Sequence, residues 1–480
     1  MVLKTGTKDD FEIADDLISK VRDLLIEHNQ KTGDNIETEY KPDLSESQQK
    51  AFNKFKKGEN LLILGAAGCG KSKLVKEFHR YIKKENTEKE MYITSTTGIS
   101  AYNVNGITIN SFMGIGTGEQ SVEVLLKRLR YKMGIKDRIK RTDILVIDEI
   151  SMMSASVFEK LDTICKTLRK SYKPFGGIQL VLTGDFLQLE TVFNKNIKLL
   201  KNELEDKRLL IESDMFNNFF NKKNNNIIIL KENYRQKSDP SYINLLLRIR
   251  DGTQTEKDIN ILKSRLRLIP KGNHVCIVNS NKSAQAINEM HLSKIKYPMK
   301  EYVAYFEKSG KNEEIDNILI NELNNQFIQK GMNKIELKIG TRVMLTKNLD
   351  VSIGLVNGSV GLIDSFIKND QYDREYPLVI FDNIPGKHLI LPVKIELELD
   401  NCICLAHQIP LMLAYALTTH KVQGLTLDSA ILDLETAFCN GQVYVALSRV
   451  KNFDGLYIKS FDPKKIKVNK KIKEFLDNLS

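Results

Sequence analysis

Residues 65–72 read GAAGCGKS, between the apolar run NLLIL (60–64) and the helix-like run KLVKEFHRYIKK (73–84). The stretch matches G-x-x-x-x-G-K-[ST], in which glycines let backbone N–H groups curl around an anion. The following helix points the positive end of its dipole at the same place. This strand–loop–helix order favours a phosphate-binding loop over a Gly-rich turn that binds nothing, and it predicts a nucleoside triphosphate ligand.

Each part of this loop has its own expected contact with the triphosphate. Lys71 should reach the β- and γ-phosphates, and the Ser72 hydroxyl should bind Mg²⁺. The remaining backbone should cradle the phosphates. The predicted nucleotide-binding residues of the loop are Gly65, Ala66, Ala67, Gly68, Cys69, Gly70, Lys71 and Ser72.

Two neighbouring carboxylates end another apolar run, DILVIDEISMM (143–153). Adjacent side chains on a strand point to opposite faces, but at a strand end the chain turns, so both can face the nucleotide. Asp148 is then expected in the Mg²⁺ shell, and Glu149 is expected to orient and deprotonate the attacking water. The alternative is a surface Asp-Glu pair.

Three further residues are candidates for the γ-phosphate. Gln188 follows the buried run in LVLTGDFLQLETV (180–192), where an amide can hold the phosphate or its water. Guanidinium groups suit developing phosphate charge, and Arg235 in LKENYRQ (230–236) and Arg449 in GQVYVALSRVKN (441–452) carry such groups. The chain has many arginines, and these two are chosen only by the resemblance described below. A loop glutamine and surface arginines are the alternatives.

The order of the apolar runs predicts an α/β fold. Strand-like and helix-like runs alternate from residue 44 to about 230, which is typical of a parallel sheet covered on both faces. Ligands of such sheets sit at the carboxyl ends of the strands. The predicted strands of this unit are NLLIL, MYITS (91–95), ILVID (144–148), IQLVLTGD (178–185) and NNIIIL (225–230).

A second α/β unit is interrupted in the sequence. HVCIVNS (274–280) begins it, and SAILDL (429–434) and GLYIKSF (455–461) complete it. Short β-like runs with glycine turns lie between them and predict a small inserted β-barrel. The expected units are 1–43, an acidic helix and linker; 44–230, with an insert at 115–140; 231–339 with 409–480; and 340–408, the barrel.

Charge and composition narrow the class of protein. Residues 1–47 have a net charge of −6 and the other residues +17, so a basic body follows an acidic leader and favours a polyanion partner such as nucleic acid. An ordinary solvated surface remains the alternative. No apolar run approaches a membrane span, no secretory signal is present, and six scattered cysteines indicate a reducing compartment, cytoplasmic or nuclear. The amphipathic run 10–28 should pack on the body or bind a partner protein.

Taken in order, these stretches resemble the superfamily-1 helicases, and more narrowly the Pif type (petite integration frequency), which is related to RecD. The resemblance covers residues 44 to 462. Besides the stretches above, it rests on LSESQQKAF (44–52), TSTTGISAYNVNGITINSF (94–112), VFEKLDTICKTLRK (157–170), VMLTKNLDVSIGLVNGSVG (343–361) and AYALTTHKVQGLTLDSAILDL (414–434). This sequence has Cys69 where the family usually has threonine, and Glu190 and Thr191 where it has two prolines.

The resemblance implies an ATP-dependent DNA helicase with 5′-to-3′ polarity. It implies two RecA-like domains, an SH3-like inserted barrel and a wedge at 115–140 that splits the duplex. Gln48 would read adenine, Gln423 and Gly424 would line the nucleotide site, and Arg235 and Arg449 would be arginine fingers. The residues implied to contact single-stranded DNA are Thr96, Thr97, Phe112, Asn357, His420 and Lys421, of which Phe112 and His420 could be core residues instead.

Other functions stay open at this stage. An RNA helicase or a translocase that does not unwind would share these motifs, because the choice of strand depends on 2′-OH contacts. A nucleotide-switched scaffold could use the 10–28 helix, although such a switch does not need Glu149, Gln188 and both arginines. The group Cys402, Cys404 and His407 lacks a fourth ligand, so Mg²⁺ is the one metal expected. We expect a monomer that binds single-stranded and forked DNA.

Overall fold

The computed structural model describes residues 42–479 except 86–87, 98–99, 102–103, 105, 117, 119, 131, 192–208, 269–273, 308–319, 322–323, 325–332, 348, 351–352, 356–357, 370–373, 383 and 400–401. The predicted helix over 10–28 and the DNA-contact candidate Asn357 lie outside the described residues.

A six-stranded parallel sheet forms the first half of the chain, in the order β3-β2-β4-β5-β1-β6. The five predicted apolar runs form five of its strands, and the sixth, β3, was not predicted, so the α/β prediction is confirmed for this part. The strands are β1 Leu61–Gly65, β2 Glu90–Ser95, β3 Ile107–Thr108, β4 Thr142–Asp148, β5 Gln179–Gly184 and β6 Ile227–Leu230.

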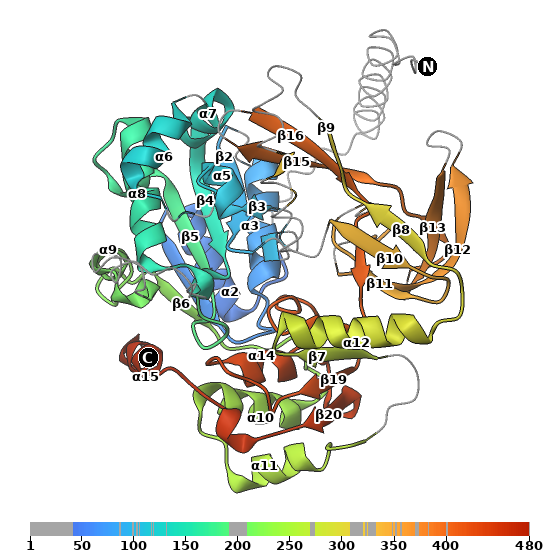
Figure 1. Cartoon of the computed structure of the whole chain (residues 1–480). Helices are drawn as coiled ribbons and strands as arrows, with labels where there is room; N and C mark the ends of the chain where they lie inside the picture. Colours follow the sequence, from blue (N-terminus) through green and yellow to red (C-terminus); the bar gives the residue numbers. More distant parts are fainter. Residues whose placement is uncertain are drawn as a thin grey trace, which may run out of the picture. The chain divides into compact units, whose positions relative to one another are not determined.

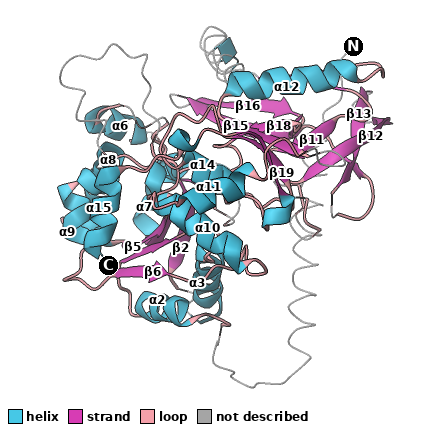
Figure 2. Ribbon diagram, turned by 90° about the horizontal axis from the view of Figure 1, so that it is seen from below, coloured by secondary structure: helices cyan, strands magenta, loops and turns pink. Residues whose placement is uncertain are grey.

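Helices cover both faces of this sheet, which explains why its strands are continuously apolar. Alternate strand residues such as Leu62, Leu145 and Leu180 share one core with Phe158 and Leu161 of α8. Figure 2 shows α2 and α3 lying away from α8 and α9. The helices of this part are α2 Glu46–Lys56, α3 Lys71–Glu85, α5 Ile109–Met113, α6 Val122–Leu129, α7 Met133–Arg141, α8 Ala155–Arg169 and α9 Asp214–Phe219.

A second parallel sheet has the order β18-β7-β19-β20 and confirms the interrupted α/β unit. Its strands come from both sides of a long β-rich segment, which Figure 1 shows as a separate group of yellow and orange strands. The elements are α10 Pro240–Asp251, α11 Glu256–Lys263, β7 Val275–Val278, α12 Asn281–Lys294, β18 Ala416–Thr418, β19 Ala430–Asp433, α14 Gln442–Leu447, β20 Leu456–Ser460 and α15 Lys470–Leu479.

The β-rich segment contains three antiparallel groups: β14-β13-β12-β11-β17, β15-β16-β9 and β10-β8. Four of these strands, β8, β9, β10 and β17, lie outside the range 340–408 expected for the insertion. The SH3-like topology stays a prediction. The strands are β8 Lys300–Val303, β9 Tyr305–Glu307, β10 Lys334–Leu337, β11 Arg342–Leu345, β12 Val360–Asn369, β13 Arg374–Phe381, β14 His388–Leu389, β15 Val393–Leu399, β16 Cys402–Gln408 and β17 Leu411–Leu413.

The last helix, α15, returns to the first sheet after the second is complete. Ile472 is buried in the core of the first sheet, and Phe475 packs edge-on against Phe186 with ring centroids 5.9 Å apart. Its apolar face is therefore part of that core. No helix in the described ranges has the length and apolarity to cross a membrane.

Candidate nucleotide site

The phosphate-binding loop connects the buried strand β1 to α3. Gly68 and Gly70 have φ of +83° and +85°, a region that side chains rarely adopt. A Cβ at Gly68 would lie 2.7 Å from the Cβ of Arg235, and one at Gly70 would lie 2.5 Å from Nε2 of Gln48. Glycine is therefore required twice here, for the curl of the loop and for the close approach of its neighbours.

Lys71 begins α3 and is largely buried. Its Nζ donates to the carbonyl oxygens of Gly65 at 2.7 Å and Ala66 at 3.1 Å. Burial alone would lower the pKa of Lys71, but Cys69 and the carboxylates of Asp185, Glu149 and Asp148 outweigh it and raise the pKa. The ammonium group is therefore charged and ready to exchange its carbonyl partners for phosphate oxygens.

The acidic pair lies at the carboxyl end of β4. Glu149 adopts the left-handed conformation, with φ 53° and ψ 46°, and this turn lets both carboxylates line the pocket. Burial raises the pKa of both groups, and the neighbouring Asp148 raises that of Glu149 further. A raised pKa makes Glu149 a better proton acceptor, which suits a general base.

Gln188 lies in the loop after β5 and is 3% exposed. Its Nε2 donates to Oδ2 of the fully buried Asp185 at 3.3 Å, and its backbone N–H donates to the Asp185 carbonyl at 3.0 Å. The amide therefore reaches the pocket from a fixed loop.

Both predicted arginines line the same pocket. Arg449, on the segment after α14, is 1% exposed and donates to the carbonyls of Val445 at 2.9 Å and Leu425 at 3.4 Å. Arg235 follows β6 and donates from Nη1 to the carbonyl of Ser448 at 3.0 Å. Burial lowers the pKa of each arginine, and Arg235 lowers that of Arg449 further. A buried cation, Arg449, and a half-buried one, Arg235, in the same pocket favour an anion between them.

These residues surround one pocket of about 550 Å³. It brings together most of the predicted site, from the loop residues 67–72 to Asp148, Glu149, Gln188, Arg235, Gly424 and Arg449. Six lining residues were not predicted as site residues, although all six lie within stretches quoted in the sequence analysis. The six are Lys73, Lys76, Ser100, Tyr234, Thr426 and Lys451.

Four predicted residues lie just outside the lining. Gly65 and Ala66 contribute the carbonyls that hold Lys71. The Gln48 side chain completes the capping box of α2, because its Oε1 accepts from the N–H of Ser45 at 3.1 Å. Gln423 donates from Nε2 to Oε2 of Glu149 at 3.1 Å. The adenine-reading role of Gln48 stays a prediction.

The oxygen donors at the pocket fit a magnesium ion. The Ser72 hydroxyl and the Asp148 carboxylate both line it, and oxygen ligands with few protein carboxylates are what Mg²⁺ prefers beside phosphates. Asp148 is held in place by Thr183 and by the N–H of Glu149 at 2.9 Å. Within the described residues, no group of three or more His, Cys, Asp or Glu side chains forms another metal site.

The residues predicted to contact DNA have different surroundings in the structure. The Thr96 hydroxyl donates to the Glu149 carbonyl at 2.8 Å, so this segment touches the acidic pair. Thr97 caps the next turn through the N–H of Ser100 at 3.2 Å. His420 and Lys421 are half-buried, and burial lowers the pKa of both. Phe112 is a correction: it is fully buried in the first core beside Tyr92, so its ring cannot stack on a base.

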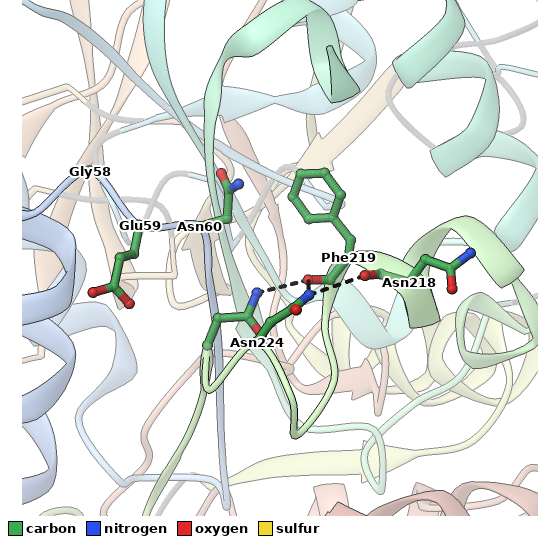
Figure 3. A pocket seen from close by; sticks show the side chains of 7 residues that line it. Gly58, Glu59, Asn60, Asn218, Phe219 and Asn224 are labelled. Carbon is green, nitrogen blue, oxygen red and sulfur yellow. Dashed lines mark hydrogen bonds between the residues drawn. The ribbon is translucent and has the colours of Figure 1, made fainter.

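A second pocket, of about 370 Å³, lies at the amino ends of β1 and β6, opposite the phosphate-binding loop. In Figure 3 the side-chain amide of Asn224 donates to the carbonyls of Asn218 and Phe219. Glu59 is its one titratable side chain. None of the predicted catalytic residues lines it.

The fold and the first pocket define a P-loop nucleoside triphosphatase. The phosphate-binding loop and the acidic pair lie on the first parallel sheet, and they face arginines from the part of the chain that builds the second parallel sheet. Comparisons identify the family more narrowly. Residues 43–260 match the family model "PIF1-like helicase", and residues 319–366 match "DNA helicase Pif1, 2B domain". The chain belongs to the PIF1-like helicase family.

Individual relatives agree with this assignment. The chain is 31% identical to uncharacterized protein 030L of Invertebrate iridescent virus 6, over 91% of this chain and 94% of that protein. It is 31% identical to ATP-dependent DNA helicase PIF1 of Danio rerio, over 91% of this chain but only 64% of the relative. The chain thus spans less than two thirds of the fish protein.

Solved structures support the fold over nearly the whole chain. The Pif1 helicase of Candida albicans superposes with a TM-score of 0.78 at 30% identity, over 92% of this chain and 100% of that one. A Bacteroides Pif1 bound to single-stranded DNA superposes with a TM-score of 0.66 at 26% identity, over 91% and 97%. The RecA-like α/β class is therefore confirmed.

Proposed function

We propose that this chain is an ATP-dependent DNA helicase that moves 5′ to 3′ along single-stranded DNA and unwinds duplexes in DNA replication, repair or recombination. The observation that carries the proposal is the complete hydrolytic set in one pocket of a PIF1-like chain. Lys71, Glu149, Gln188, Arg235 and Arg449 all line it. A nucleotide-switched scaffold does not need a general base and two arginines at the γ-phosphate.

The proposed chemistry is water attack on the γ-phosphate of ATP. The loop N–H groups and Lys71 hold the phosphates, and Glu149 takes the proton of the water that Gln188 orients. Mg²⁺, held by Ser72 and Asp148, neutralises charge on the phosphate oxygens when bound. Arg235 and Arg449 exchange their carbonyl partners for γ-phosphate oxygens, which stabilises the transition state.

The same exchange supplies the motion. Arg449 belongs to the core of the second sheet through α14, whereas Lys71 and Glu149 belong to the first. ATP therefore draws the two sheets together, and hydrolysis with phosphate release lets them separate. The hydroxyl of Thr96 donates a hydrogen bond to the carbonyl of Glu149. A DNA strand bound at Thr96 and Thr97 can therefore change the position of the general base.

DNA binding through a basic, sequence-tolerant groove completes the proposal. We assign Thr96, Thr97, His420, Lys421 and Asn357 to the DNA strand. We assign residues 115–140, which include α6 and all but the last residue of α7, to the wedge at the fork. The unit boundaries 44–230, 231–339 with 409–480, and 340–408 are proposed on the same basis. A monomer suffices for this scheme, and the 10–28 helix is proposed to recruit a replication or repair protein.

Strand displacement tests the proposal directly. We expect unwinding with ATP and Mg²⁺ of a forked duplex and of a duplex with a 5′ tail, and none of a duplex with a 3′ tail. Unwinding from the 3′ tail alone would contradict the polarity. Hydrolysis stimulated by DNA without unwinding would identify a translocase, and stimulation by RNA oligomers but not by DNA would identify an RNA helicase.

The electrostatic part of the proposal predicts salt-sensitive binding. Because Lys and Arg side chains displace counterions from phosphates, the affinity for a single strand should fall by about 10³-fold or more between 50 mM and 200 mM salt if six or more phosphates are held. Fluorescence anisotropy with a labelled oligothymidylate measures it. A flat response would contradict a groove that follows the backbone.

A further inference from the structure

The helix α10 carries two arginines that form ion pairs in different places. It begins at Pro240, capped by Asp239, and ends at Gly252, which has φ +68°. Arg248 and Arg250 lie two residues apart and therefore project to nearly opposite sides of the helix. Arg248 pairs with Asp258 of α11, within its own part of the fold, at 2.6 Å.

Arg250 instead crosses to the loop after β5 of the first sheet. Its Nη2 lies 2.7 Å from Oδ1 of Asp185, and its Nε donates to both carboxylate oxygens at 3.2 Å and 3.1 Å. Asp185 is fully buried, and the Arg250 side chain is 15% exposed. Because removing Arg250 would leave an uncompensated buried carboxylate, the Asp185 loop depends on this contact from the second half of the fold.

The same carboxylate holds the pocket glutamine. Oδ2 of Asp185 accepts from the Gln188 amide at 3.3 Å, and Oδ1 accepts from the N–H of Leu187 at 3.2 Å. Arg250 itself does not line the pocket, whereas Gln188 does. A chain of contacts thus leads from the second sheet's helix, through one buried carboxylate, to a group that faces the γ-phosphate.

Close backbone packing surrounds this bridge. A Cβ at Gly441, just before α14, would lie 2.3 Å from the carbonyl oxygen of Gln188, so the two backbones touch there. The Tyr444 hydroxyl accepts from the N–H of Ala67 in the phosphate-binding loop at 2.9 Å. A shift of the second sheet is therefore transmitted to the loops of the first without slack.

We infer that Arg250 is a positioning residue for ATP hydrolysis: it holds Asp185, and through it sets the loop that presents Gln188 to the γ-phosphate. The inference rests on the proposed function and deepens it, because it names the contact by which the second half of the fold controls the water-orienting group. Arg250 touches neither the nucleotide pocket nor the expected path of the strand.

The test compares DNA-stimulated ATP hydrolysis in four full-length variants: Arg250→Met, Asp185→Asn, the double variant, and Arg248→Met as the matched control from the same helix. We expect Arg250→Met to lower kcat roughly 10- to 100-fold, as misplaced catalytic groups do, with the KM for ATP within about threefold of wild type. Arg248→Met should stay within about twofold in kcat, because its partner is remote from the pocket.

Two further measurements separate positioning from stability. Asp185→Asn with Arg250→Met leaves no unpaired buried charge, so its thermal midpoint should recover towards wild type while kcat stays low. In a Gln188→Ala background, Arg250→Met should lower kcat by less than about twofold more, because both act on one step. Recovery of kcat together with stability, or a full additional loss in the Gln188→Ala background, would overturn the inference.

The proposed function fails in a different way. Wild-type protein that does not hydrolyse ATP with DNA, or a Lys71→Ala variant with wild-type turnover, would refute the nucleotide site itself. Active wild-type protein, inactive Lys71→Ala and an Arg250→Met variant with normal kcat would refute the role of Arg250 alone.

Discussion

The two sides of the nucleotide pocket hold their cationic side chains differently. On the first side, Nζ of Lys71 donates hydrogen bonds to the carbonyls of Gly65 and Ala66, within the phosphate-binding loop. On the second side, Arg449 lies on the carbonyls of Val445 and Leu425, which belong to the second half of the fold. Phosphate oxygens can replace both sets of carbonyls. The exchange at Lys71 would be local, whereas we propose that the exchange at Arg449 moves one half relative to the other.

From this difference we propose that the first side binds ATP and that the second side moves. The acidic pair and the loop are set by one continuous sheet, so their mutual geometry does not depend on the cleft being closed. The contacts of Arg449 and Arg250 should depend on closure of the cleft, because each arginine belongs to the second half of the fold and reaches residues of the first half. Substitutions on the two sides should therefore have different effects on ATP binding and turnover.

The largest effect is expected at Lys71. Lys71→Ala removes the charge that faces the phosphates, so both ATP binding and hydrolysis should be lost, with turnover reduced by about 10⁴-fold or more. Lys83→Ala, at the exposed far end of the same helix, is the control and should behave as wild type. Equilibrium binding of a fluorescent ATP analogue and a phosphate-release assay measure the two quantities. Normal binding in Lys71→Ala would break the distinction between the sides.

Arg449→Ala should lose turnover but keep binding. An arginine at the γ-phosphate contributes about 10³-fold or more to the rate, whereas the loop and Lys71 hold ATP without it. Arg449→Lys should not restore the rate, because an ammonium cannot make the planar, bidentate contacts of a guanidinium. A loss of less than tenfold would show that Arg449 is not the finger.

A smaller effect is expected at the backbone contact between the sides. Gly441→Ala places a Cβ against the Gln188 carbonyl and strains a residue with φ +70°, so we expect about a tenfold lower kcat and a loss of about 1 to 2 kcal/mol in unfolding free energy. Gly58→Ala has a similar φ of +77° but no atom within 4 Å of its Cβ. If both variants lose kcat equally, strain rather than the contact is responsible.

The smallest effect on activity is expected at Arg248. Arg248→Met should leave turnover unchanged and cost about 1 to 3 kcal/mol of stability, since the arginine is partly exposed but its partner Asp258 is buried. The hydrogen bonds from Arg248 hold the pKa of Asp258 well below its usual range. The stabilisation is therefore fully present above the unfolded carboxyl pKa, about 3.9, and is lost as pH falls below it. Urea unfolding of both proteins at pH 7 and pH 3 checks this sign.

Most residues predicted for the nucleotide site line one pocket, and their roles there stay predictions. The phosphate-binding loop and the acidic pair each lie at the end of a short apolar element, where periodicity and residue type are informative. The two arginines were chosen by the family resemblance, because residue type alone does not distinguish them from the other arginines. Both parallel sheets follow from the same alternation. Relations between distant segments were harder to predict. Phe112 fits a DNA-contact stretch, yet its ring lies in the core because α5 turns it inward beside Tyr92.

The sequence by itself determined what binds phosphate, because a P-loop is made by eight consecutive residues. The tertiary structure alone decided which of the two arginines of α10 reaches the first sheet. Arg248 and Arg250 are two residues apart in one helix and chemically identical, and nothing in the sequence distinguishes their partners. The helical rotation between them, together with the packing of α10 against α14, turns one toward α11 and the other toward Asp185.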